Sequence, residues 1–121
     1  ILTGSMKPGH TFREGDSRQN TPLFAPENFE RALAVTERVK EVARKYDKTP
    51  AQTAVRWVMQ CEGMTAPIVG ARKRSQVEDN AGAIGWELAK EDREYLDAYS
   101  REFAYSLPMY KTLFDKTIEK E

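Results

Sequence analysis

The residues of this chain best suited to chemistry lie between Ile68 and Asn80. An apolar run ends at Gly70, a short basic turn follows, and Ser75-Gln76-Val77-Glu78 has the spacing of a capping box, which predicts a helix start. A glycine lets a ligand approach the backbone closely. The first N–H groups of a helix lack intrahelical partners, and the positive end of the helix dipole lies there. The arrangement therefore predicts an anion site.

The side chains around this turn indicate which anion it suits. Arg72, Lys73 and Arg74 lie on the turn, where a cationic group can pair with a phosphate. Asp79 and Asn80 lie one turn into the helix and can accept from and donate to the edge of a base. The pattern predicts a site for a phosphorylated, adenine-bearing ligand. The alternative is a solvated basic loop followed by ordinary surface residues of a helix.

The charge balance limits the classes of partner. Lys plus Arg number 19 and Asp plus Glu number 19, so the net charge at pH 7 is zero. A neutral chain has no global field that draws it onto nucleic acid or an anionic membrane. No aromatic residue interleaves with the basic triplet. We therefore expect no nucleic acid and no membrane as partner, and any phosphate site must be local.

Composition also bears on the compartment. No apolar run approaches the roughly 20 residues of a membrane span, and no signal-peptide pattern opens the chain. The single cysteine, Cys61, excludes an internal disulfide and favours a reducing compartment. We expect a cytoplasmic protein in which Cys61, Trp57 and Trp86 serve packing. No residue is assigned to a metal.

Helices must position the candidate site. Apolar residues at i, i+3 and i+4 spacing predict a helix over 29–46. Thr49-Pro50-Ala51-Gln52 predicts a second helix, with Thr49 and Gln52 as a capping box and Pro50 at the first position. Residues 4–28 carry scattered glycines and prolines and predict one long loop. Further helices are expected over 75–85, over 90–103 and in the tail after residue 108.

Only one complete strand is predicted. The run from Thr65 to Ala71 is short, apolar and bounded by turn residues, as is typical of a strand buried in a parallel sheet. Such a strand needs neighbours on both sides, so we interpret the chain as a piece of a larger protein or assembly. An alternative hypothesis is a non-enzymatic helical module that self-associates through unpaired strand edges or binds a partner chain.

Motifs in this order resemble the aldo-keto reductase family. Thr49-Pro50-Ala51-Gln52 followed by Ala54-Val55-Arg56-Trp57-Val58 resembles the penultimate helix of that family's barrel. Pro67-Ile68-Val69-Gly70-Ala71-Arg72, with Gln76 and then Asp79-Asn80, resembles its last strand and adenosine-phosphate loop. The resemblance covers about residues 1 to 100.

The start of the chain extends the resemblance. Leu2-Thr3-Gly4 is similar to the segment after the family's seventh strand. The long loop, with Thr11-Phe12, Asp16-Ser17-Arg18 and Pro22-Leu23-Phe24, resembles that of bacterial reductases of the inositol-operon or general-stress type. One departure is Ser5, where the family commonly has Lys or Arg, although Lys7 lies nearby.

The resemblance implies an α/β fold class, namely the C-terminal portion of a (β/α)8 TIM barrel that is mostly helical as an isolated fragment. Residues 1–100 would hold the end of strand 7, the long loop, helix 7, strand 8, helix 8 and the following helix. Residues 101–121 would form a helical C-terminal tail.

The resemblance also implies NADPH or NADP+ as the cofactor, with its adenosine half held here. Gly70, Arg72 and Gln76 would line the pocket for the ribose and 2′-phosphate. Asp79 and Asn80 would hydrogen-bond the adenine amino group. Arg18 would clamp the phosphates, and Leu2 would lie near the pyrophosphate. The full implied cofactor-binding set is Leu2, Gly4, Arg18, Gly70, Ala71, Arg72, Gln76, Asp79 and Asn80.

Catalysis in the family needs residues that this chain does not match. The family reduces a carbonyl substrate through a tetrad of Asp, Tyr, Lys and His on earlier strands, and a barrel needs roughly 250 residues. The four matching segments would lie before Ile1. We assign no catalytic residue, and expect His10 to be an exposed bystander. The parent is expected to be an NADP-dependent oxidoreductase for aldehydes or ketones, and the 121-residue chain alone is expected to be inactive.

Overall fold

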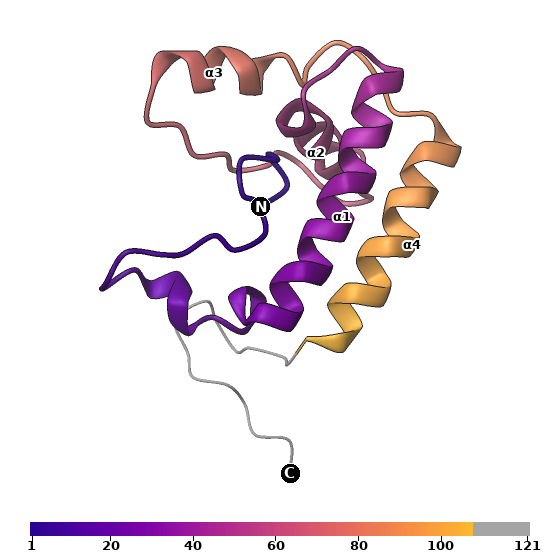
Figure 1. Cartoon of the computed structure of the whole chain (residues 1–121). Helices are drawn as coiled ribbons and strands as arrows, with labels where there is room; N and C mark the ends of the chain where they lie inside the picture. Colours follow the sequence, from indigo (N-terminus) through magenta and orange to yellow (C-terminus); the bar gives the residue numbers. More distant parts are fainter. Residues whose placement is uncertain (108–121) are drawn as a thin grey trace.

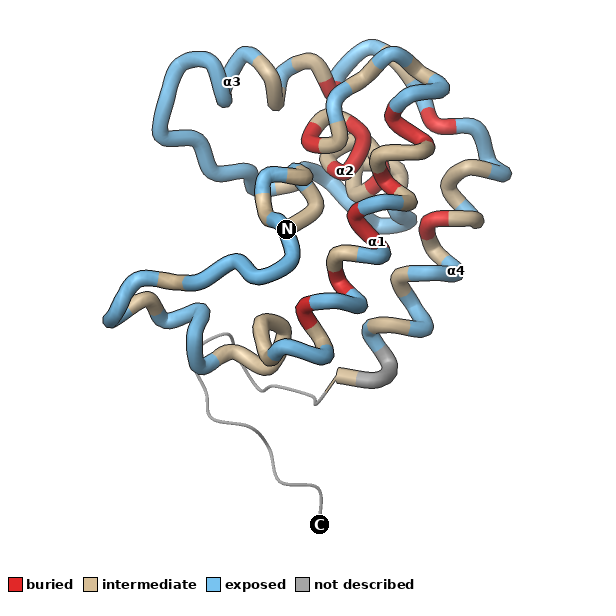
Figure 2. The backbone as a smooth tube through the Cα atoms, in the orientation of Figure 1, coloured by how far each residue is buried: buried red, intermediate tan, exposed pale blue. Residues whose placement is uncertain are grey.

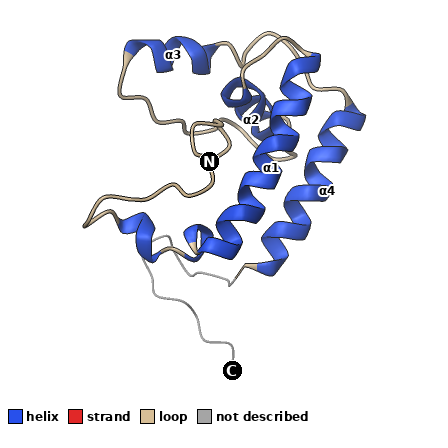
Figure 3. Cartoon of the chain, in the orientation of Figure 1, coloured by secondary structure: helices blue, strands red, loops and turns tan. Residues whose placement is uncertain are grey.

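The computed structural model describes residues 1–107, which form helices joined by loops (Figure 1; Figure 3). Two short 3-10 helices, Ser17–Asn20 and Pro22–Phe24, lie in the predicted long loop. The main helices are α1 (Pro26–Lys45), α2 (Pro50–Met59), α3 (Arg74–Ala81) and α4 (Lys90–Ser106). The helices predicted near 29–46, after Thr49 and over 90–103 are thus confirmed. The helix expected after residue 108 lies outside the described residues.

The core lies where α1 packs against α2 and α4 (Figure 1; Figure 2). Its buried residues come from all three helices and from the segment before α4, namely Val39, Val42, Ala54, Trp57, Leu88 and Leu96. The Trp57 indole N–H donates to Asp97 Oδ1 at 2.7 Å and so ties α2 to α4. Trp86 packs against Tyr46 at the edge of this cluster, with ring centroids 5.2 Å apart. The expected packing roles of Trp57 and Trp86 are confirmed.

The start of α2 matches its prediction in detail. The Thr49 hydroxyl accepts a hydrogen bond from the Gln52 backbone N–H at 3.1 Å. The Gln52 Oε1 accepts one from the Thr49 backbone N–H, also at 3.1 Å. Both bonds satisfy donors that a helix start leaves without intrahelical partners. Pro50 occupies the first turn, where its missing N–H costs nothing.

The strand predicted over 65–71 is wrong for this structure. These residues run as an extended, mostly exposed loop, and residues 1–107 contain no strand (Figure 3). A strand exists only where a second strand satisfies its backbone, and no segment of the described chain pairs with this one. The Ile68 side chain is fully exposed as a result. Cys61, expected to pack, is likewise exposed.

Candidate functional site

The loop before α3 is held by a glutamine rather than by the predicted capping box. Gln76 Oε1 accepts from the backbone N–H of Arg72 at 2.7 Å and of Lys73 at 3.2 Å. This bond places the helix start at Arg74, so Ser75 lies inside the helix and the Ser75–Glu78 capping box is wrong. Gln76 acts on the backbone of the basic turn and fixes its path.

Two cations of the basic turn have no partner among residues 1–107. Arg74 Nε donates to Glu78 Oε1 at 2.7 Å, one helical turn along. Arg72 and Lys73 are exposed, and neither side chain has a hydrogen bond or ion pair with a described residue. They lie beside the start of α3, where the backbone N–H groups of Arg74 and Ser75 have no acceptor among the described residues. The turn therefore offers positive charge and backbone donors at one place.

Asp79 joins α3 to the start of α2. Its Oδ1 atom accepts from the Thr49 hydroxyl at 3.0 Å and from Gln52 Nε2 at 3.0 Å. A carboxylate beside the first turn of a helix is also favoured by the helix dipole. The other oxygen, Oδ2, accepts no hydrogen bond from the described residues. One oxygen of Asp79 thus anchors the helix pair, and the second remains an open acceptor.

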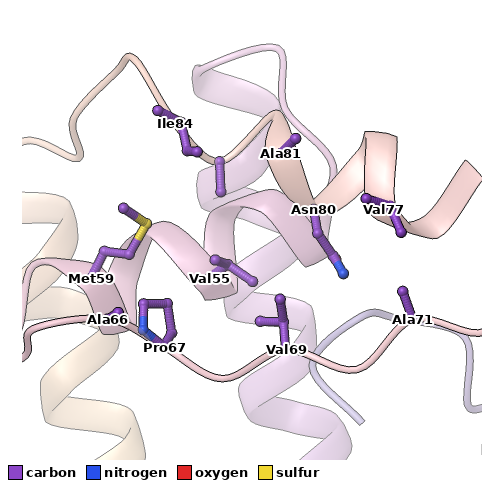
Figure 4. Close-up of a pocket in the computed structure, with 11 residues that line it drawn as sticks. Val55, Met59, Ala66, Pro67, Val69, Ala71, Val77, Asn80, Ala81 and Ile84 are labelled. Atoms are coloured by element: carbon purple, nitrogen blue, oxygen red, sulfur yellow. The ribbon is translucent and has the colours of Figure 1, made fainter. Parts of the chain in front are cut away.

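Asn80 lies at an apolar hollow of about 420 Å³ between α2, α3 and the extended segment before α3. Figure 4 shows its side chain pointing from α3 towards the segment that carries Val69 and Ala71. Its amide is the polar group among apolar lining residues, which are Val55, Met59, Ala66, Pro67, Val69, Ala71, Val77, Ala81, Ala83 and Ile84. Ala71 thus borders the same hollow as Asn80. Gly70 next to it is exposed, and a Cβ built there meets no atom within 4 Å.

The first residues of the chain lie beside the start of α2. Gly4 has a φ of +76°, and a Cβ built on it would lie 2.9 Å from Lys40 Cε and 3.7 Å from Pro50 Cγ. Leu2 packs against the buried cluster. It also lines a second apolar hollow with Leu23. Gly4 and Asp79 therefore both border the first turn of α2, whereas Leu2 points to the core.

Arg18 is paired with Asp16 and not with any residue of the basic turn. Its Nε and Nη2 atoms donate to the two oxygens of Asp16 at 2.9 and 2.6 Å, and its guanidinium carbon lies 4.7 Å from the centroid of the Phe12 ring. The hydrogen bonds from Arg18 lower the pKa of Asp16 from 3.8 to about 2. Figure 1 shows the short helix that carries Arg18 well away from α3. The structure does not bring Arg18 to the basic turn.

Three residues of this region escaped the sequence prediction. Thr49 and Gln52 were expected only to cap α2, yet they also hold Asp79. Gly82 makes room for this contact, because a Cβ built on it would lie 2.3 Å from Gln52 Nε2. Thr49 and Gln52 lie far from Asp79 in the sequence, so no short motif predicts their contact with it. No local pattern predicts the role of Gly82 either.

Other site types find no support in the described residues. Within residues 1–107, no group of three or more His, Cys, Asp and Glu side chains lies close enough to hold a metal ion. None of the helices described there combines the length and apolar character that crossing a membrane requires. His10 is exposed, as expected, and the centroid of its ring lies 4.9 Å from that of Phe12, with the two rings nearly perpendicular.

Comparison with known proteins gives the family. The profile of the aldo/keto reductase family matches residues 1–101. The chain is 33% identical over 95 residues to aldo-keto reductase YhdN of Bacillus subtilis, which covers 78% of this chain and 29% of the relative. It is 32% identical over 101 residues to the NADP(+) aldo-keto reductase yakc of Schizosaccharomyces pombe, covering 80% and 30%. The chain thus spans about three tenths of the length of these relatives.

A solved structure with a similar fold supports the same family. The glycerol dehydrogenase of Gluconobacter oxydans superposes with a TM-score of 0.73 at 32% identity, and the match covers 94% of this chain and 34% of that one. The helices described above are accordingly those of a portion of a (β/α)8 barrel. The chain belongs to the aldo/keto reductase family.

Proposed function

We propose that this chain carries the part of an NADP(H)-dependent aldo-keto reductase that binds the adenosine phosphate of the cofactor. The whole protein would reduce aldehydes or ketones to alcohols in the cytoplasm. One observation carries the proposal: the side chains of Arg72 and Lys73 have no partner among the described residues, and they lie beside the backbone N–H groups of Arg74 and Ser75, which have no acceptor there either. A phosphate dianion suits this combination of fixed cations and backbone donors.

The chemistry of the neighbouring side chains fits the rest of the adenosine. Asp79 Oδ2 is an open acceptor one turn along α3, which suits an exocyclic amino group. Asn80 supplies an amide at an otherwise apolar hollow, and apolar walls with a few polar groups are typical of small-molecule sites. Gly70 leaves space beside the backbone. Gly4 and Ala71 would border the ligand, whereas Leu2 would have to leave the core and Arg18 would have to leave Asp16 to contribute a contact.

NADPH, when bound, supplies the hydride for carbonyl reduction. In this proposal the present chain binds and orients the adenosine end of the cofactor. No residue of it is assigned a proton-transfer role.

A titration of the 121-residue chain with adenosine 2′,5′-bisphosphate, followed by heteronuclear NMR, tests the binding site. We expect saturable shifts at residues 72–80 and weaker binding of adenosine 5′-monophosphate, which lacks the 2′-phosphate. Arg72→Met should weaken binding by about tenfold, in keeping with a charge-assisted hydrogen bond. Arg74→Met is the matched control, because Arg74 is already paired with Glu78. Absence of saturable binding would contradict the proposal.

The catalytic part of the proposal has its own test. The 121-residue chain should not oxidise NADPH in the presence of an aldehyde or ketone, because its residues include no assigned proton donor. Turnover by a purified, sequence-verified sample of this chain would overturn that expectation.

One observation favours the alternative of self-association. The extended residues 65–71 leave their backbone unpaired within the described chain, and Ile68 is fully exposed. Bare edges of this kind promote pairing between chains. Light scattering over a range of concentrations would detect a dimer, and Ile68→Lys should shift it towards monomer. A monomer at all concentrations would exclude the alternative.

A further inference from the structure

The contact between Asp79 and the start of α2 uses two side chains whose own positions are fixed. Thr49 and Gln52 bond to each other's backbone N–H groups in the capping box of α2. Each then donates to Asp79 Oδ1 at 3.0 Å. Gln52 uses its Oε1 atom for the cap and its Nε2 atom for Asp79. The oxygen and the nitrogen of its side-chain amide are therefore both hydrogen-bonded. The Asp79 carboxylate is thereby held by donors that cannot rotate away without breaking the cap.

The backbone of α3 is shaped for this contact. Gly82 lies against Gln52, and a Cβ at this position would fall 2.3 Å from Gln52 Nε2 and 2.9 Å from Cδ. Real side chains do not approach so closely, so only glycine leaves Gln52 in place. α2 and α3 thus meet through a polar contact. It requires a residue without a side chain at Gly82 and the hydrogen-bonded amide of Gln52.

We propose that Thr49 and Gln52 are positioning residues that set recognition of the adenine base through Asp79. This inference rests on the proposed function. Because Oδ1 is occupied by two donors, the free Oδ2 is presented in one orientation for the exocyclic amino group of adenine. Neither Thr49 nor Gln52 needs to touch the ligand. Hydrogen bonds from supporting residues fix the geometry of ligand-binding groups in this manner.

The variant Gln52→Glu separates this role from helix capping. Glutamate keeps an oxygen that can accept from the Thr49 N–H, and Thr-x-x-Glu is itself a capping box. The substitution replaces the donor at Asp79 Oδ1 with a second anion, and like charges at this distance repel. We expect α2 to stay capped and Asp79 to turn away from its present position.

The measurement that tests this role is the ratio of the affinities for two nucleotides that differ only in the base. If Thr49 and Gln52 only stabilised the fold, their substitution would leave that ratio unchanged. Inosine 2′,5′-bisphosphate keeps both phosphates of adenosine 2′,5′-bisphosphate but has an oxygen in place of the amino group. The native chain should prefer the adenosine compound, and Gln52→Glu should reduce that preference by about tenfold, the effect of losing one hydrogen bond to a charged group. The affinity for the inosine compound should change only as much as in the control variant.

Gln60→Glu is that control. It makes the same change in charge at the other end of α2, where Gln60 bonds to the backbone of Leu88. Thr49→Val supplies a second variant, which removes the hydroxyl from Asp79, and Thr49→Ser should restore selectivity. Circular dichroism checks that each variant folds.

The outcomes distinguish this inference from the function on which it rests. Failure of the native chain to bind either nucleotide would refute the proposed function and the inference with it. Equal binding of the two nucleotides would leave phosphate binding in place and refute the role of Asp79 in base recognition. Selectivity that survives in both Gln52→Glu and Thr49→Val would refute the positioning role alone.

Discussion

The side-chain oxygen Oε1 of Gln76 lies 2.7 Å from the backbone nitrogen of Arg72 and accepts its hydrogen bond. A residue inside α3 thereby determines where the basic turn before that helix runs. The Arg72 side chain stays free of partners among residues 1–107, while its backbone is fixed. A charged side chain on a fixed backbone loses less entropy when it binds a ligand than one on a loose loop.

We therefore predict that Gln76→Ala loosens the turn. The amides of Arg72 and Lys73 should exchange with solvent roughly two- to tenfold faster, which matches the loss of a hydrogen bond of about 0.5–1.5 kcal/mol. Gln76→Glu keeps the accepting oxygen and should retain the protection. Hydrogen exchange followed by NMR measures both variants. Unchanged exchange in Gln76→Ala would show that the bond does not hold the turn.

Gly82→Ala should destabilise the chain. The added methyl group would overlap Gln52 and break its bond to Asp79, and overpacking of this kind costs about 1–3 kcal/mol. Gly70→Ala is the control, because its Cβ meets nothing within 4 Å and its φ lies outside the left-handed region. Urea unfolding should show a lower midpoint for Gly82→Ala only. A normal midpoint for Gly82→Ala would mean that Gln52 moves aside without loss.

The Asp16–Arg18 pair should make the stability of the fold depend on pH in the acid range. The hydrogen bonds from Arg18 hold the pKa of Asp16 at about 2, below the ordinary value of 3.8. A folded-state pKa below the unfolded value means that the pair stabilises the fold above pH 3.8, and that this effect is lost as the pH falls from there through about 2. Both side chains reach solvent, so the effect on stability is small and screened by salt.

NMR titration of the Asp16 carboxyl group checks this directly. Its midpoint should lie near 2 in the native chain and return towards 3.8 in Arg18→Met. An unchanged midpoint in Arg18→Met would place the cause of the shift elsewhere.

Tyr46→Phe should weaken the contact between α1 and the start of α4. The Tyr46 hydroxyl donates to Asp92 Oδ2 at 2.7 Å and accepts from the Ala89 backbone N–H at 2.8 Å. Burial is the largest cause that raises the pKa of Tyr46 above 10.0, so this hydroxyl stays protonated at neutral pH and its stabilising effect is lost only as the pH rises through the raised pKa. Thermal unfolding at neutral pH should show a loss of about 2–4 kcal/mol, the sum for one neutral hydrogen bond and one to a charged group. Tyr99→Phe, at a more exposed ring, is the control and should leave stability close to native.

Local patterns predicted the helices well. The cap of α2 depends on residues three positions apart, and the apolar spacing of α1 and α4 determines their buried faces, so sequence alone sufficed there. The start of α3 was misplaced because two candidates compete, and Gln76 reaches the turn that Ser75 was expected to cap. The composition of 65–71 still favours a strand, but a strand is a property of two segments, and the described residues supply one.

The candidate site was predictable in its types of residue and less so in its geometry. Helix chemistry and the family resemblance predicted the basic turn, Asp79 and Asn80 as site residues, and their role in binding stays a prediction. That Asp79 bonds to Thr49 and Gln52 depends on how α2 and α3 pack, which no short motif encodes. Arg18 and Asp16 lie two residues apart, so their ion pair follows from a short local pattern, and it occupies the guanidinium that was expected to contact the phosphates.

The extended segment at 65–71 has one more consequence. It divides the sequence into two pieces that also meet away from it, since α4 from the second piece packs on α1 from the first and Trp57 bonds to Asp97 across the divide. Severing the backbone there removes no hydrogen bond between residues 65 and 71 and leaves the core residues on both sides with their partners. The chain could therefore be split within this segment and expressed as two halves. Reassembly of the halves would measure how strongly the helices pack against each other.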